Sequence, residues 1–468
     1  MKYFYLKRRA FGVVLLLAAN VAGLAQGGKK SVIDERDVRA HMEFLASDAM
    51  QGRGSGTVFE RLAAEYIGLQ MRLFGLEPAG DMNAAGKATF VQTINISRNS
   101  FAGPPTVKFG STTLEHGKEM IVMRSNAASL SGELKKVALT EKPMAGSAAF
   151  VSMGDMGTGQ NLMQSLQTVT TGDASIVLVE ETAQTRSTWA AVASRPIRWT
   201  TSATQKPSAI IIVSKQAAAE ISGLPAGTKI EFGGTVAPAQ VQNTWNAAGK
   251  ITGTDNALAS EVILLSSHLD HVGVRPNDPG EDKIYNGADD DASGTTAVLE
   301  LARVLAGGKR PKRTVYFVCF GSEESGGFGA RHFVENMPFP KEKLVANLEF
   351  EMIGRPDAKV KPEELWLTGY ERSNLGPELA KRGAKLVQDP HPEQNFFQRS
   401  DNIQLARAGI IAHTVSSFGL HSDYHKASDE VKTIDFVHMT RSINSMVGPV
   451  MWLVNSDFKP AWNPGGRP

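Results

Sequence analysis

The sequence contains a single cysteine, Cys319, so the chain cannot form an intramolecular disulfide. It also lacks an excess of charge: the formal net charge is +2, which argues against a nucleic-acid-binding surface. The apolar run at residues 10–22 is shorter than the ~20 residues that a membrane span needs, and Asn20 interrupts it. No internal repeat is evident. With 42% hydrophobic and 21% charged residues, the composition is that of an ordinary folded protein.

The N-terminus has the pattern of a secretory signal peptide. Basic residues come first, the apolar run follows, and small residues end it at Ala25. We therefore expect a signal peptide at residues 1–25 and a secreted or periplasmic protein with no stable membrane anchor after cleavage. An uncleaved membrane anchor is the alternative. No cysteine lies near the cleavage site, which argues against a lipoprotein anchor.

At 468 residues the chain is longer than one core usually supports, so we expect two domains. Residues 103–238 are rich in Ser, Thr, Ala and Gly, with short apolar runs and no clustered His or acidic residues. They are interpreted as an inserted β-rich domain. The flanking residues 31–102 and 239–456 then form one discontinuous domain, and residues 457–468 form a Pro/Gly tail with no core pattern.

Histidine and acidic residues follow the predicted strands of the larger domain. The first apolar run ends in His268-Leu-Asp270, and the strand period of two places both side chains on the same side. An imidazole can then bind a metal while the neighbouring carboxylate orients it. Two further apolar runs, at residues 314–320 and 344–350, precede the pair Glu323-Glu324 and Glu351. In open α/β sheets, sites form beyond the carboxyl ends of the strands.

Three adjacent acidic residues, 289–291, precede a helical pattern at residues 295–306. A helix N-cap accounts for at most one of them. Their mutual repulsion favours a bound cation. The sequence therefore predicts a metal centre at this edge of the sheet.

These motifs resemble those of the co-catalytic zinc aminopeptidases, whose superfamily also holds glutamate carboxypeptidase II, glutaminyl cyclase and the transferrin receptor. The resemblance implies a three-layer α/β fold with the sheet sandwiched by helices, and an insert similar to a protease-associated domain. Glu351 departs from the family pattern, in which many members have Asp, and it lengthens that ligand by one methylene. The implied metal ligands are His268, Asp290, Glu324, Glu351 and His425.

Two Zn²⁺ ions per chain are implied, with Asp290 bridging them. His268 and Glu351 would bind one ion, and Glu324 and His425 the other. The three carboxylates and one bridging hydroxide balance the charge of two divalent ions. Manganese or cobalt suits similar ligands, but imidazole with carboxylate in an exported protein favours zinc.

The resemblance also implies roles for residues around the ligands. Glu323, which in an extended chain faces away from Glu324, is the expected general base for a metal-bridged water. Asp270 is expected to orient His268. Tyr424 and Asp401 are substrate-binding candidates; their alternatives are a packing role for Tyr424 and a solvated loop acid for Asp401.

Other residues near these motifs receive no chemical role. Asp289 and Asp291 are interpreted as serving the turn and the helix start. The loop at residues 52–54 opens the peptidase domain by the resemblance, with a plain turn or a phosphate-binding loop as alternatives. His421 lies near the site. The histidines that match no motif are interpreted as ordinary core or surface residues: 41, 116, 271, 332, 391, 413 and 438.

The function that these features favour is an exported zinc-dependent aminopeptidase that removes N-terminal residues from peptides. A carboxypeptidase or dipeptidase of the same fold is an alternative. A glutaminyl cyclase would need one zinc, and a catalytically dead receptor-like protein would be expected to have lost ligands. The sequence does not determine side-chain specificity or oligomeric state.

Overall fold

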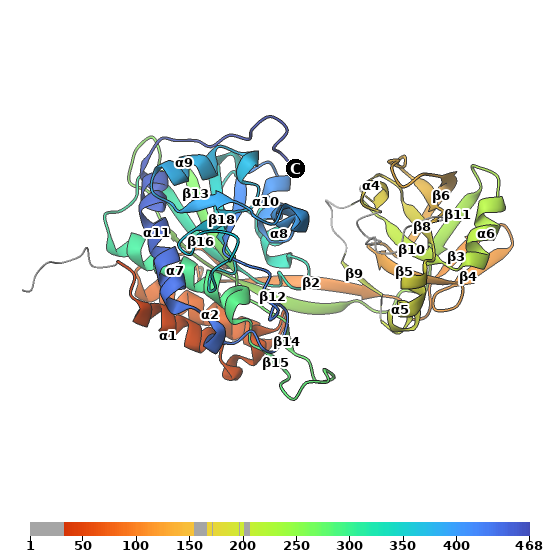
Figure 1. Cartoon of the computed structure of the whole chain (residues 1–468), viewed down its shortest axis with the longest axis horizontal. Coiled ribbons are helices and arrows are strands. Elements are labelled where there is room, and N and C mark those ends of the chain that lie inside the picture. Colours follow the sequence, from red (N-terminus) through yellow and green to blue (C-terminus); the bar gives the residue numbers. More distant parts are fainter. Residues whose placement is uncertain (1–31, 154–165, 171, 196, 201–205) are drawn as a thin grey trace, which may run out of the picture. The chain divides into compact units, whose positions relative to one another are not determined.

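The computed structural model describes residues 32–468 except 154–165, 171, 196 and 201–205. The predicted signal peptide, residues 1–25, lies outside the described residues. The chain divides into two compact units (Figure 1). One comprises Met1–Ile94 with Thr244–Pro468, and the other comprises Asn95–Asn243. The sequence placed the boundaries of the insert at residues 103 and 238, a few residues inside those of the second unit.

The larger unit is built on a mixed sheet whose central strands are parallel. β13 (Val262–His268) lies between β16 (Thr314–Phe320) and β17 (Leu344–Phe350), and β20 (Ala412–Ser416) pairs with β17. These strands are near-continuous apolar runs because both faces of the sheet are covered. The sheet order is β19 (Leu386–Gln388), β18 (Leu365–Leu367), β20, β17, β13, β16, β12 (Gln240–Ile251) and β2 (Val91–Ser100), with β1 (Glu77–Pro78) beside β12.

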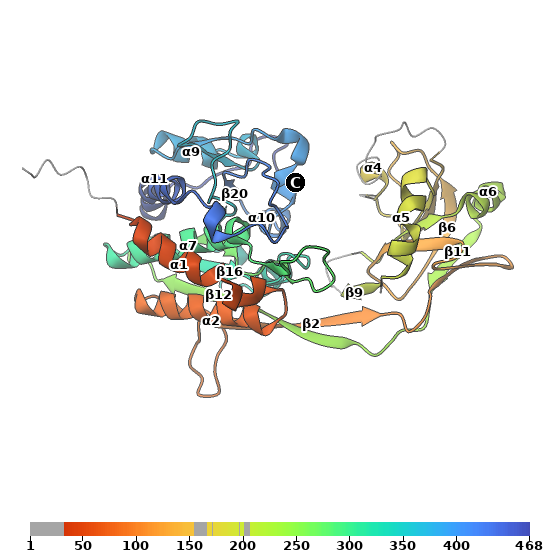
Figure 2. The ribbon, with the colours of Figure 1, turned by 60° about the horizontal axis from the view of Figure 1, so that its bottom comes forward.

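Helices cover both faces of this sheet (Figures 1 and 2). Alternate residues of β13 enter two separate cores: Ile263 and Leu265 pack in one, and Val262 and Leu264 in the other. The first core includes residues of α1 (Glu35–Leu45), α2 (Val58–Leu73), α7 (Gly294–Gly307), α9 (Leu375–Lys381) and α11 (Phe436–Asn455). The second includes residues of α8 (Phe328–Glu335) and α10 (Asn402–Arg407). The predicted three-layer α/β fold is confirmed.

The smaller unit is a β-rich, barrel-like domain with its own apolar cores, as the sequence predicted. Its helices are α4 (Gln167–Thr170), α5 (Ala183–Ala193) and α6 (Lys215–Gly223), and the short β9 (Arg198–Thr200) pairs with β2. The order of its sheet is β4 (Thr112–Glu115), β3 (Thr106–Phe109), β11 (Lys229–Gly233), β6 (Ser129–Lys136), β7 (Ser147–Val151), β8 (Ile176–Glu180), β10 (Ala209–Val213) and β5 (Met120–Ser125).

The C-terminal segment differs from its prediction as a tail without core contacts. Trp462 is partly buried against both cores of the larger unit, and its indole Nε1 donates a hydrogen bond to the Gly409 carbonyl at 3.3 Å. The backbone of Trp462 also pairs with Ser373 in an isolated β-bridge. A single anchoring aromatic produces no periodicity, so the sequence pattern did not reveal it.

None of the helices in the described part of the chain has both the length and the apolar character that crossing a membrane requires.

Candidate metal centre

The carboxyl ends of three adjacent strands bring the predicted residues together. His268 is the last residue of β13, Glu351 directly follows β17, and the pair Glu323-Glu324 lies in the turn after β16. Because β13 is parallel to both neighbours, these ends meet at one edge of the sheet. This is the edge at which open α/β sheets form sites.

The first group of donor atoms surrounds the imidazole of His268. Its Nε2 lies 3.1 Å from Asp290 Oδ1 and 3.9 Å from Glu351 Oε1. The imidazole is fully buried, and the three side chains are close enough to hold one ion. They are the ligands that the sequence assigned to one zinc, with Asp290 as the bridging residue.

The second group uses the other oxygen of Asp290. His425 Nε2 lies 3.1 Å from Asp290 Oδ2 and 3.2 Å from Glu324 Oε1. His271 lies here too, with Nδ1 at 2.8 Å from Glu324 Oε1 and 3.7 Å from Asp290 Oδ2. The sequence analysis interpreted His271 as an ordinary histidine and did not place it in this group. Its spacing matches no ligand motif, and only its position one residue after Asp270 could have indicated it.

Several donor atoms of both groups are buried without a hydrogen-bond partner among the described residues: His268 Nε2, His271 Nδ1, Asp290 Oδ2 and Glu324 Oε1. A buried polar atom left without a partner costs free energy, so such atoms normally have one. One cation in each group, with Asp290 shared between them, would satisfy all four atoms. Imidazole and carboxylate are ligands that Zn²⁺ accepts, so the residues fit the predicted zinc ions.

The carboxylates of the two groups differ in pKa. Burial, opposed by His268, raises the pKa of Glu351 to about 8. Burial and Asp290 also act to raise the pKa of Glu324, but the imidazoles of His271 and His425 lower it to about 2. The first group therefore holds a proton at neutral pH when no cation is present. A divalent ion would displace that proton.

The acidic loop is held by backbone donors, which accounts for two of its three carboxylates. Asp291 accepts hydrogen bonds from the backbone N–H groups of His268, Gly294 and Met352, at 3.2, 2.9 and 3.1 Å. Asp289 accepts one from Gly354 N–H at 2.8 Å. Both side chains thus serve the turn and the start of α7, as the sequence indicated.

Asp429 was missed by the sequence analysis. Its carboxylate accepts hydrogen bonds from the backbone N–H groups of Asp289 and Asp290, at 3.0 and 3.1 Å. It is fully buried, and it closes the motif in which His425 lies. Asp429 therefore fixes the backbone from which Asp290 reaches both donor groups.

Asp270 plays a different part from the one predicted. His268 Nδ1 lies 3.2 Å from the backbone carbonyl oxygen of Asp270, whereas the nearer carboxylate oxygen lies 3.8 Å away. The carboxylate instead accepts hydrogen bonds from Ser55 Oγ at 2.5 Å and from Glu323 N–H at 3.0 Å. The imidazole is oriented by the main chain, and the Asp270 side chain positions the turn that carries Glu323.

Glu323 and Glu324 lie in a turn and not in the extended chain that the prediction assumed. Gly326 N–H donates to the Glu323 carbonyl at 2.8 Å, so the turn, not strand alternation, separates the two side chains. Burial and the carboxylates of Asp401, Glu351 and Glu324, opposed by His268, raise the pKa of Glu323 well above 4.5. Glu323 is thus close enough to the centre to interact with both donor groups.

Glu60 and Arg53 support the site from the N-terminal segment, and neither role was predicted. Glu60, fully buried on α2, accepts a hydrogen bond from Ser322 N–H at 2.7 Å, next to Glu323. Arg53 is 1% exposed and donates to four backbone carbonyls. The acceptors belong to Leu45, Leu269, Asn286 and Gly287, at 2.6, 2.9, 2.7 and 2.9 Å. The loop at residues 52–54 is therefore structural and neither a plain turn nor a phosphate loop.

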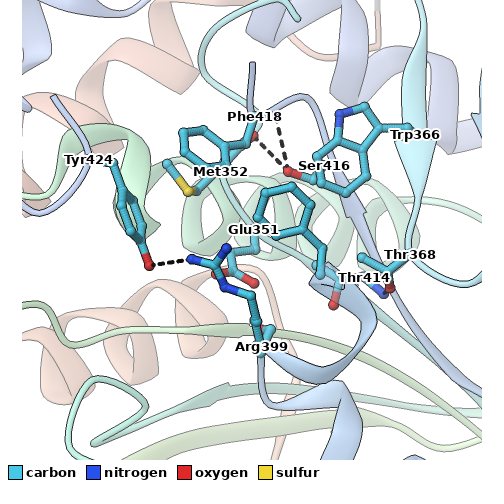
Figure 3. A pocket seen from close by; sticks show the side chains of 11 residues that line it. Glu351, Met352, Trp366, Thr368, Arg399, Thr414, Ser416, Phe418 and Tyr424 are labelled. Atoms are coloured by element: carbon cyan, nitrogen blue, oxygen red, sulfur yellow. Dashed lines mark hydrogen bonds between the residues drawn. The ribbon is translucent and has the colours of Figure 1, made fainter. Parts of the chain in front are cut away.

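A narrow pocket of about 30 Å³ adjoins the first donor group (Figure 3). Glu351 lines it, together with the hydroxyl-bearing residues Thr368, Ser400, Thr414 and Ser416. Arg399 reaches into the same view, with its guanidinium 3.5 Å from the Tyr424 hydroxyl. The apolar lining residues are Met352, Trp366, Phe396, Phe418 and Tyr424.

The two predicted substrate-binding residues lie in different surroundings. Tyr424 lines the pocket and stacks on His425 with ring centroids 3.9 Å apart. Asp401 does not line the pocket, and the alternative of a solvated acid is wrong because it is only 1% exposed. Burial and the neighbouring Glu349 raise the pKa of Asp401 well above 3.8.

Comparisons with known proteins agree with this geometry. An aminopeptidase of Pseudomonas aeruginosa is 37% identical over 99 residues, which are 21% of this chain and 16% of that protein. Aminopeptidase YwaD of Bacillus subtilis is 24% identical over 207 residues, 43% of each chain. The chain thus spans less than half the length of these curated relatives.

Solved structures share the fold. The aminopeptidase from Aneurinibacillus sp. strain AM-1 superposes with a TM-score of 0.51 at 20% identity, covering 92% of this chain and 96% of that one. A zinc aminopeptidase from Bacillus subtilis gives 0.51 at 18% identity, covering 91% and 96%. Residues 246–447 match the family model described as Peptidase family M28, and this range contains both donor groups. This part of the chain is therefore similar to peptidase family M28.

Proposed function

We propose that the protein is an exported zinc-dependent aminopeptidase that hydrolyses the first peptide bond of peptides. The observation that carries the proposal is the pair of donor groups sharing Asp290, with a pocket at Glu351 and with Glu323 next to Glu324 in the chain. The aminopeptidase names of the relatives in Pseudomonas and Bacillus support it. Export is inferred from the signal-peptide pattern of residues 1–25.

The residues divide the tasks of hydrolysis between them. His268 and Glu351 would hold one zinc, Glu324 and His425 the other, and Asp290 both. The bound ions would supply Lewis acidity that polarises the scissile carbonyl and lowers the pKa of water. The backbone carbonyl of Asp270 lies against Nδ1 of His268, and this contact keeps Nε2 of the same imidazole directed at the first donor group.

Glu323 is the proposed general base. It accepts a proton from the attacking water and delivers it to the leaving amine, so the same carboxyl acts first as base and then as acid. Asp270 and Glu60 hold the backbone on either side of its α-carbon. This fixed turn keeps the carboxylate at one place during both proton transfers.

The pocket at Glu351 is the proposed site for the side chain of the N-terminal residue. Its aromatic wall offers apolar contact to a side chain beside the metal centre. Tyr424 lines the pocket and stacks on His425, which supports a role for it in binding the substrate next to the scissile bond. An exopeptidase requires such a pocket beside its metal centre.

An N-terminal acetyl group should abolish cleavage. An aminopeptidase site binds a free amine, and the acetyl group removes its charge and adds bulk in the pocket. The measurement is turnover of a free and an N-acetylated peptide of the same sequence by the zinc-loaded protein. Equal turnover of both peptides would point to an endopeptidase or a carboxypeptidase.

Metal-saturated protein should contain about two ions per chain. One ion cannot balance Asp290, Glu324 and Glu351 without leaving one carboxyl protonated, and Glu351 is that carboxyl because its pKa is about 8 without metal. Elemental analysis after removal of loosely bound metal gives the count. A limit of one ion per chain would contradict the dinuclear centre.

A further inference from the structure

His271 is buried to an unusual degree for a histidine without a hydrogen-bond partner. Its side chain is fully inaccessible, and neither ring nitrogen has a hydrogen-bond partner among the described residues. Nδ1 nevertheless lies 2.8 Å from Glu324 Oε1, an atom that also lacks one. The two atoms are close but are not aligned for a hydrogen bond. Such an arrangement is expected when two metal-ligand atoms are directed at the same ion.

Other buried histidines of the larger unit are satisfied differently. His413 has its two ring nitrogens 2.7 Å from the Ser373 hydroxyl and 2.7 Å from the Thr368 carbonyl. His391 Nε2 lies 2.8 Å from Asp357 Oδ2, while its buried Nδ1 has no hydrogen-bond partner among the described residues. These contacts are ordinary hydrogen bonds in a core. His271 instead faces two carboxylates, both of which also lie against His425 Nε2.

The local backbone is shaped to admit this imidazole. Gly287 has φ +58°, and a Cβ at that position would lie 2.4 Å from His271 Cγ. His271 N–H donates to the Arg53 carbonyl at 3.2 Å, which fixes the main chain from which the ring extends. Any residue with a side chain at Gly287 would displace the ring from the second donor group.

We propose that His271 binds the second metal ion through Nδ1. Its distances of 2.8 and 3.7 Å to Glu324 Oε1 and Asp290 Oδ2 fit two ligands bound to one ion, since each ligand atom lies ~2.0–2.2 Å from zinc. With His425, the second ion then has four protein ligands. The first ion has three and keeps an open position.

The consequence is that the two ions are bound unequally. Four side-chain ligands close the coordination shell of the second ion, as in structural zinc sites, whereas the three-ligand site stays open to water and substrate. The second site should therefore fill first and release its ion last. This inference rests on the proposed dinuclear centre but not on any particular substrate.

The direct test is nuclear magnetic resonance of protein labelled with ¹⁵N-histidine and loaded with ¹¹³Cd²⁺. A metal-bound nitrogen shows scalar coupling to ¹¹³Cd, whereas a nitrogen that only donates a hydrogen bond carries a proton and shows none. We expect coupling at His271 Nδ1, together with couplings at Nε2 of His268 and His425. A protonated, uncoupled Nδ1 in the fully loaded protein would overturn the proposal.

Variants extend the test to affinity. His271→Gln should weaken one of two cadmium-binding steps by at least ~10–100-fold, the loss that even an outer partner of a ligand causes. His391→Gln is the matched control, because it also alters a buried imidazole beside a carboxylate and should leave both steps unchanged. Two unaltered steps in folded His271→Gln would contradict the inference. These measurements need no substrate. A protein that shows the ¹¹³Cd coupling at His271 Nδ1 but no peptidase activity would therefore refute the proposed function and not this inference.

Discussion

Glu323→Gln should lower turnover by roughly 10²–10⁴-fold, the usual contribution of a positioned acid-base group. The amide has nearly the shape of the carboxylate but cannot accept the proton of the attacking water. None of the donor atoms around Asp290 belongs to Glu323, so metal content should not change. Thermal stability should not fall either, because the substitution removes a buried carboxyl whose pKa is raised by burial and neighbouring acids.

Glu324→Gln is the matched control for this experiment. It makes the same chemical change one residue away, but it removes a charged donor from the second group and should lower metal occupancy there. Steady-state kinetics and elemental analysis of both variants separate the two roles. If Glu323→Gln lost metal and Glu324→Gln retained it, the assignment of base and ligand would be reversed. Full activity of Glu323→Gln would refute the general-base role.

Arg53→Met should lower the free energy of unfolding by about 3–5 kcal/mol, as expected when a buried charged group is removed and its partners stay buried. Four backbone carbonyls would lose their donor at once. Two of them belong to Asn286 and Gly287, directly before the acidic loop, so metal binding should weaken as well. Methionine fills most of the volume, which limits the contribution of a cavity.

Urea unfolding of the metal-free protein measures the loss of stability in Arg53→Met. Metal-free protein is used because bound metal would itself add to the free energy of unfolding. Arg36→Met is the control, because Arg36 is exposed on α1 and its ion pair with Asp37 is a surface pair. That substitution should change stability by less than about 1 kcal/mol. Equal midpoints for the two variants would show that Arg53 does not hold the strand ends together.

Strand periodicity and the order of motifs determined much of the metal centre. The apolar runs that became β13, β16 and β17 are continuous because both faces are covered, and parallel strands of this kind place their carboxyl ends together. The strand pattern therefore predicted that His268 and Glu351, more than eighty positions apart in the sequence, lie at one edge of the sheet, and the family resemblance implied that they share an ion. Residues at strand ends are predictable because the sheet itself brings them together.

The turn chemistry was less predictable. Strand alternation gave the wrong reason for separating Glu323 from Glu324, because hydrogen bonds within a turn orient them. Spacing also suggested the Asp270 carboxylate as the partner of His268, but the backbone carbonyl of the same residue lies closer. Patterns in a sequence describe side chains, and they contain little information about which main-chain oxygen is free.

The sequence by itself therefore determined the fold class, the inserted β-rich domain and the resemblance to the zinc aminopeptidases. Only the tertiary structure decided which other residues support the centre: Arg53, Glu60, His271 and Asp429. Glu60 meets Ser322 and Asp429 meets Asp289, contacts between positions more than a hundred residues apart. No periodicity encodes such contacts. Their physical cause is that buried carbonyls, amides and imidazoles must each find a partner in the folded chain, whichever segment supplies it.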